Sequence, residues 1–250
     1  MTNRFSTEDL ILVTGASSGI GRATVEKLLS EGARVVGIAR REDKLKEIAK
    51  ISENFYYEVF DVSNIEDIAH LVKSMVSKYG KFSGFVHCAG MLNPQPLSLW
   101  EYKDAINDFK VNVFSAIEFT KILSKKKNKQ DLLNIVYTSS IAANIGNPGA
   151  CTYAMTKSSL NNLVISLVQE LKLQNIRINS IMPGWTNTSL ADKYNNLIGI
   201  NFLEKAKGKT FFNRYATVND IIPLIIFLLS KESYWVQGQN IIIDGGETVG

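Results

Sequence analysis

The stretch Leu12-Val13-Thr14-Gly15-Ala16-Ser17-Ser18-Gly19-Ile20-Gly21 decides the fold of this chain. An apolar run leads into a glycine-rich turn, and an amphipathic segment beginning Arg22-Ala23-Thr24-Val25 follows. Glycines in such a turn adopt backbone angles closed to other residues and bring main-chain N–H groups to a phosphate, whose charge the next helix also favours. The order strand, turn, helix therefore predicts a pyrophosphate-binding turn.

Short apolar runs continue to alternate with segments of helical periodicity up to the C-terminus, and no linker interrupts them. Predicted strands are Leu10–Val13, Arg34–Ala39, Asn54–Phe60, Gly84–His87, Leu133–Thr138, Arg177–Ile181 and Asn240–Ile243. Predicted helices are Gly21–Glu31, Lys44–Ile51, Ile65–Tyr79, Trp100–Lys125, Thr152–Leu173 and Val218–Ser230. This alternation predicts one α/β domain over residues 1–250, a doubly wound, mostly parallel, seven-stranded sheet covered on both faces. Such sheets bind ligands beyond the carboxyl ends of their strands.

Composition narrows the class of protein. The chain has 250 residues, 45% of them hydrophobic and 21% charged, with a net charge of +4 and two cysteines outside any metal-ligand pattern. We expect an ordered, reduced cytoplasmic protein without a metal site, signal peptide or membrane span. The run Lys125, Lys126, Lys127 and Lys129 is a solvated loop or a patch for an acidic partner. It lacks the interleaved aromatics of a nucleic-acid site.

A second motif joins Tyr153 and Lys157, which project from one face of a predicted helix. By itself this pair is an ordinary helix surface, but Ser140 follows a predicted strand and so belongs at the ligand-binding edge. A phenol of pKa about 10 is a poor base at neutral pH. A nearby ammonium lowers that pKa and burial opposes the change, so proximity and partners set the sign.

The spacing Thr14-Gly15 to Gly19 and Gly21, with Ser140, Tyr153 and Lys157, resembles the classical short-chain dehydrogenase/reductase family over nearly the whole chain. The resemblance implies a Rossmann fold and hydride transfer between a nicotinamide and a carbonyl or alcohol. It implies that Tyr153 passes the proton, Ser140 orients the substrate oxygen, and Lys157 holds the ribose and lowers the tyrosine pKa. Asn112, otherwise a surface residue or a satisfied core amide, would hold a water of a proton relay.

Cofactor choice depends on the end of the second strand. Arg40 and Arg41 follow Ala39, where relatives that prefer NAD carry an acidic residue. Guanidinium groups bind a phosphate through paired hydrogen bonds and charge, so we expect NADP(H). The alternative is that both arginines are solvated partners of Glu42 and Asp43.

The resemblance extends the expected cofactor site to further motifs. His87-Cys88-Ala89-Gly90 stands where most relatives have Asn-Asn-Ala-Gly, so His87 is expected to be structural. The full set of residues expected to contact the cofactor is Gly15, Ser17, Ser18, Gly19, Ile20, Gly21, Arg40, Arg41, Asp61, Val62, Ala89, Gly90, Tyr153, Lys157, Pro183, Gly184, Thr186 and Thr188.

Substrate identity is less constrained. The chain looks most like 3-oxoacyl-(acyl-carrier-protein) reductases, whose substrate is carrier-bound, but reductases of sugars, steroids or other small ketones share the same motifs. A non-catalytic NADP-binding sensor or scaffold would lack the tyrosine or lysine. Residues 185–214, with Tyr194, Phe202, Phe211 and Phe212, are a predicted substrate lid. Apolar residues including Val113, Ile117, Leu160 and Val164 predict a homo-oligomer, a tetramer or dimer.

Overall fold

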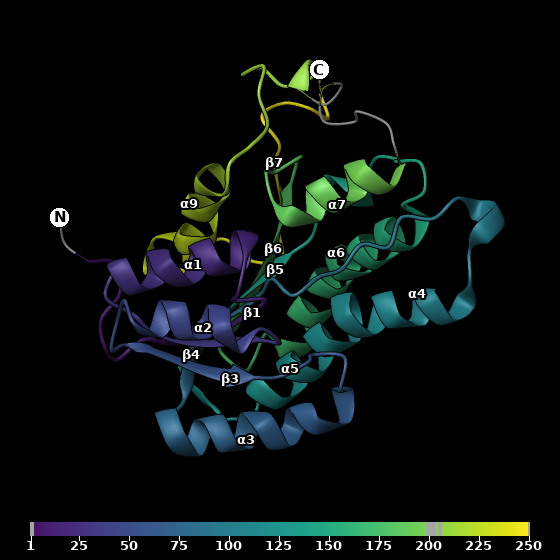
Figure 1. Cartoon of the computed structure of the whole chain (residues 1–250). Helices are drawn as coiled ribbons and strands as arrows, with labels where there is room; N and C mark the ends of the chain where they lie inside the picture. Colours follow the sequence, from purple (N-terminus) through teal and green to yellow (C-terminus); the bar gives the residue numbers. More distant parts are fainter. Residues whose placement is uncertain (1–2, 199–203, 205–206, 250) are drawn as a thin grey trace.

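The computed structural model describes residues 3–198, 204 and 207–249. Within this part of the chain, seven strands form one parallel sheet in the order β3-β2-β1-β4-β5-β6-β7 (Figure 1). The strands are β1 Leu10–Thr14, β2 Arg34–Ala39, β3 Phe55–Val59, β4 Phe82–His87, β5 Lys129–Thr138, β6 Ile176–Pro183 and β7 Asn240–Ile243. The predicted Rossmann fold is confirmed.

Helices cover both faces of this sheet (Figure 1). They are α1 Gly19–Ser30, α2 Glu42–Ala49, α3 Ile68–Tyr79, α4 Tyr102–Phe109, α5 Ser115–Leu123, α6 Cys151–Leu171, α7 Ser189–Ile198 and α9 Val218–Leu229. One core packs α1, α2 and α9 against the sheet, and a second packs α3, α5 and α6 against the other face. Because both faces are covered, β1 is buried throughout, which explains why its sequence lacks polar alternation.

The strand order places the ligand site. From β1 the chain winds outward through β2 and β3, then returns to add β4 on the other side of β1. The connections leaving β1 and β4 therefore diverge, which opens a crevice at the carboxyl ends of these strands. Thr14 and His87 pair in register at this edge, so the glycine-rich turn and the His87–Gly90 segment begin side by side.

The predicted helix Trp100–Lys125 is confirmed as one continuous helical segment over residues 102–123, with one irregularity in its middle. A π-helical turn, Lys110–Phe114, separates α4 from α5. Two side chains hold backbone groups at this turn: Ser115 donates to the Val111 carbonyl at 2.7 Å, and the Asn112 amide bonds to the backbone of Met91. One of these bonds is local and the other is long-range, and both accompany a π-helical turn within an otherwise continuous helix.

Two other boundaries differ from the sequence prediction. Strand β5 begins at Lys129 instead of Leu133, because Lys129 pairs with Phe82 of β4 before the register shifts between Phe82 and Gly84. Helix α7 occupies part of the predicted lid. Phe202 of that lid lies outside the described residues.

Most apolar residues that predicted self-association lie in the core instead. Val113 of the π-helical turn and Leu160 and Val164 of α6 are buried, and Ile117 is exposed. The apolar side chains exposed on α5, α6 and the π-helical turn also include Phe114, Met155 and Ile165. Among the described helices, none combines the length and apolar character needed to cross a membrane.

Candidate active site

A cavity of about 440 Å³ opens at the carboxyl ends of the strands, a volume typical of small-molecule sites. Every residue predicted to contact the cofactor lines this cavity, from Gly15 in the first turn to Thr188 before α7. Ser140 also lines it, whereas Asn112 does not. Residues far apart in sequence therefore meet at one site.

The glycine-rich turn forms a backbone cradle. Gly15 has φ +69°, and a Cβ there would lie 2.9 Å from the Ala89 nitrogen. A Cβ at Gly21 would overlap the Gly15 carbonyl oxygen. Ser18, the N-cap of α1, makes no side-chain capping bond to the helix, which leaves N–H groups of the first turn for an anion. These features fit the pyrophosphate of a dinucleotide.

The two arginines differ in their partners. Arg41 donates to the Ser17 hydroxyl from Nε at 3.3 Å and Nη2 at 3.0 Å, so its side chain lies against the glycine-rich turn. Arg40 is 77% exposed and lies 3.6 Å from the Asp61 carboxylate. Burial raises the pKa of Asp61, but hydrogen bonds from Ser63 and the Arg40 charge outweigh it and lower the pKa overall. The alternative partners Glu42 and Asp43 are not ion-paired to either arginine among the described residues.

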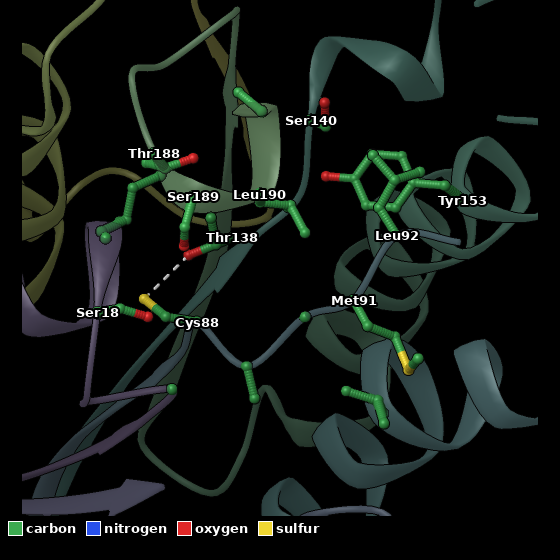
Figure 2. A pocket seen from close by; sticks show the side chains of 18 of the residues that line it. Ser18, Cys88, Met91, Leu92, Thr138, Ser140, Tyr153, Thr188, Ser189 and Leu190 are labelled. Atoms are coloured by element: carbon green, nitrogen blue, oxygen red, sulfur yellow. Dashed lines mark hydrogen bonds between the residues drawn. The ribbon is translucent and has the colours of Figure 1, made fainter. Parts of the chain in front are cut away.

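Tyr153 and Ser140 lie close together in the lining of the cavity (Figure 2). Burial raises the pKa of Tyr153 to about 12, although the hydrogen bond with Ser140 acts in the opposite direction. The Lys157 Nζ lies 5.5 Å from the centre of the Tyr153 ring and donates to the Thr138 carbonyl at 2.7 Å. Burial lowers the pKa of Lys157 to about 8. The expected lowering of the tyrosine pKa is therefore not found in this state, because burial dominates.

Asn112 holds neighbouring elements together. Its Oδ1 accepts from the Met91 nitrogen at 2.8 Å, and its Nδ2 donates to the Met91 carbonyl at 3.0 Å and to Thr156 Oγ1 at 2.9 Å. These bonds tie the π-helical turn to the segment after β4 and to α6. The side chain is thus a satisfied buried amide, and the water relay from Lys157 stays a prediction.

His87 lies fully buried beneath the cavity. Its Nδ1 is 3.0 Å from the Thr14 hydroxyl. Its Nε2 lies near the backbone of Val111 and Asn112 and has no hydrogen-bond partner of good geometry among the described residues. Burial, with the Lys157 charge, lowers the pKa of His87 to about 3, so the ring is neutral. A neutral imidazole shielded from the cavity agrees with a structural role.

The apolar wall of the cavity includes Ala150, which the sequence analysis did not identify. Leu92, Ala150 and Tyr194 form a buried cluster against which Tyr153, Trp185 and Leu190 pack. Leu190 and Tyr194 belong to α7, which lies within the predicted lid. Thr156, the partner of Asn112, carried no signal because a threonine within a helix has no distinctive spacing.

The lysine run lies far from this cavity. Lys125, Lys126 and Lys127 are exposed after α5, and Lys129 opens β5 at its amino end. The cavity is at the carboxyl end of the same ten-residue strand, about 30 Å away at about 3.3 Å per residue. This placement favours a solvated loop.

Comparisons with known proteins agree with this geometry. A family model described as enoyl-(acyl carrier protein) reductase matches residues 15–248. The chain is 30% identical over 239 residues to a 3-oxoacyl-[acyl-carrier-protein] reductase of Thermotoga maritima, covering 94% of this chain and 96% of the relative. It is 32% identical over 254 residues to a tropinone reductase homologue of Arabidopsis thaliana, covering 99% and 93%.

Among solved structures, the fold matches that of ElxO with NADP bound, with a TM-score of 0.87 at 23% identity over 97% of this chain and 99% of that one. The fold and the family model together define a nicotinamide-dependent oxidoreductase class. The chain belongs to the short-chain dehydrogenase/reductase family.

Proposed function

We propose that this protein is an NADP(H)-dependent oxidoreductase that interconverts a carbonyl and an alcohol, with Tyr153 as proton donor or acceptor. The observation that carries the proposal is the convergence of Ser140, Tyr153 and Lys157 in the cavity that the glycine-rich turn also lines. A nicotinamide bound there would supply or accept the hydride, so the protein's own groups need to move only a proton.

The charge states of the site favour reduction. A Tyr153 pKa raised to about 12 keeps the hydroxyl protonated at neutral pH, ready to donate to a developing alkoxide. The Ser140 hydroxyl can donate to the same oxygen. The tyrosinate left behind is then stabilised by the Lys157 ammonium, which lies 5.5 Å from its ring centre.

Support for NADP(H) over NAD(H) comes from the arginines. Arg41 lies against Ser17 of the phosphate-binding turn, and Arg40 is exposed beside the cavity. Both guanidinium groups are available for a phosphate on the adenosine ribose, and Ala39 places no acidic side chain there. The NADP-bound ElxO structure has the same fold, which is compatible with this choice.

Replacing Tyr153 with Phe tests the proposal. We expect kcat for NADPH-dependent ketone reduction to fall about 10²- to 10⁴-fold because the proton donor is lost. The Kd for NADPH, measured by fluorescence, should change less than about threefold, since the ring remains. Tyr234→Phe, at a 67% exposed tyrosine, is the matched control and should leave both quantities unchanged.

Two alternative functions are considered, and the second of them predicts a different outcome of the Tyr153→Phe test. Reduction of a carrier-bound 3-oxoacyl group is favoured by the name of the Thermotoga maritima relative, but the lysine run lies at the wrong edge of the sheet to dock the carrier beside Tyr153. A non-catalytic NADP-binding module would bind NADPH and reduce no carbonyl. In that case Tyr153→Phe would leave every measured property unchanged.

We also propose that the protein is a cytoplasmic homo-oligomer, a dimer or tetramer. Cys88 and Cys151 are both free thiols, which suits a reducing compartment. Phe114, Met155 and Ile165 are exposed by 40 to 54% on neighbouring segments, an apolar surface that a second copy would bury. Sedimentation velocity of the full chain measures the state directly.

A further inference from the structure

The charged side chains that line the cavity gather in its cofactor half. They are Arg40, Arg41, Asp61 and Lys157. The first three follow β2 and β3, beside the glycine-rich turn, and the Lys157 ammonium is held by the Thr138 carbonyl. No other carboxylate, ammonium or guanidinium lines the cavity within the described ranges. The wall beyond the Tyr153 hydroxyl, as far as the described residues form it, is therefore uncharged.

That wall is also largely apolar. Figure 2 shows the Tyr153 hydroxyl pointing towards Leu190, with Leu92 beside the ring. Leu190 packs with Tyr153 and Trp185 against the buried cluster of Leu92, Ala150 and Tyr194. The Trp185 and Tyr194 rings are 5.5 Å apart, so aromatic surface continues the wall. A molecule that places its carbonyl at Tyr153 would contact hydrocarbon on either side.

Two polar side chains of this wall make hydrogen bonds within the protein. The Tyr194 hydroxyl donates to the Pro148 carbonyl at 2.6 Å, and the Asn107 amide donates to the Met91 sulfur at 3.6 Å. Asn147 contributes the other side-chain amide of the described wall. A sugar would place hydroxyls against these leucines, which offer no hydrogen-bond partner, and an anionic substrate would find no cation on the described part of the wall.

We propose that the substrate is a free, uncharged ketone with hydrocarbon on both sides of its carbonyl, and that Leu190, Leu92 and Trp185 select it. This inference rests on the proposed function and extends it to a substrate class. A carrier-protein substrate fits less well, because the exposed lysine run lies about 30 Å from the cavity, at the other end of β5.

The test compares kcat/KM with NADPH across three substrate groups. These are uncharged cyclic and aryl alkyl ketones, a ketose, and an acetoacetyl group on acyl-carrier protein. We expect the uncharged ketones to exceed the others by at least about tenfold. Leu190→Asn should lower kcat/KM for those ketones about tenfold without changing the NADPH Kd. Leu173→Asn, the same change at a 91% exposed leucine, should have no effect.

A variant that gains activity separates an effect on substrate selection from a general loss of folded protein. Leu190→Arg adds a cation to the wall and should raise the ratio of kcat/KM for a keto acid over its neutral ketone analogue, which a misfolded protein cannot do. Preference for the ketose or the carrier-bound substrate, with Tyr153→Phe inactive, would overturn the substrate class and leave the proposed function standing. NADPH binding without turnover of any compound would overturn both.

Discussion

The two halves of the cavity are built by different means. The cofactor half uses backbone: Gly15 and Gly21 leave no room for a Cβ, and Ala89 approaches the turn through its main-chain nitrogen. The substrate half uses large side chains, Leu92, Trp185 and Leu190 among them, from segments far apart in the sequence. Backbone geometry demands particular residues at fixed spacing, whereas an apolar wall accepts many side chains. Changes in the two halves should therefore have different consequences.

The largest effect is expected at Gly21. A Cβ there would overlap the Gly15 carbonyl, so Gly21→Ala must displace the turn. We expect the free energy of unfolding to fall by about 3 kcal/mol and the NADPH Kd to rise at least about 100-fold. Thermal melting and NADPH fluorescence measure the two effects. Gly146→Ala, where a Cβ meets no atom within 4 Å, is the control. Unchanged NADPH affinity in Gly21→Ala would show that the cradle is not rigid.

The next largest effect on cofactor affinity is expected when Arg41 is replaced. Removing a guanidinium that bonds to a phosphate costs about 2 kcal/mol, so Arg41→Ala should raise the NADPH Kd about 30-fold and leave the NADH Kd unchanged. Arg40→Ala should have a smaller effect, because this side chain is 77% exposed and solvent screens its charge. Titrations of each variant with NADPH and with NADH measure the two Kd values. An equal loss of NADH and NADPH affinity would show that the arginines do not read the extra phosphate.

Lys157, between the two halves of the cavity, should make the activity depend on pH. The buried Lys157 has a pKa lowered to about 8, so its ammonium is present below that pH and lost above it, while Tyr153 stays protonated. We expect kcat/KM for ketone reduction to be level below about pH 8 and to fall up to about tenfold per pH unit above it. A pH–rate profile of the wild-type protein is sufficient. A profile that stays level to pH 10 would contradict the need for the ammonium.

The smallest effect is expected in the substrate half. Tyr194→Phe removes the 2.6 Å bond to the Pro148 carbonyl but keeps the ring against Trp185. We expect a loss of about 1 kcal/mol in stability, a change of less than about fivefold in kcat/KM, and an unchanged NADPH Kd. Tyr102→Phe, at a 70% exposed tyrosine, provides the comparison. A large change in NADPH affinity would mean that the two halves are coupled.

The sequence by itself determined the parallel sheet and the cofactor cradle. Apolar strand runs and glycine spacing are local requirements, so adjacent residues encode them. It also placed Ser140, Tyr153 and Lys157 in segments that the fold then brings to one edge.

Only the tertiary structure decided the contacts and charge states. Burial, which depends on the whole fold, raises the Tyr153 pKa and lowers that of Lys157. The Asn112 side chain at the π-helical turn bonds to Met91 and Thr156, which no local pattern links to it. The lysine run lies at the opposite edge from the cavity because β5 separates them. Each of these properties arises between residues distant in sequence, where spacing alone carries no information.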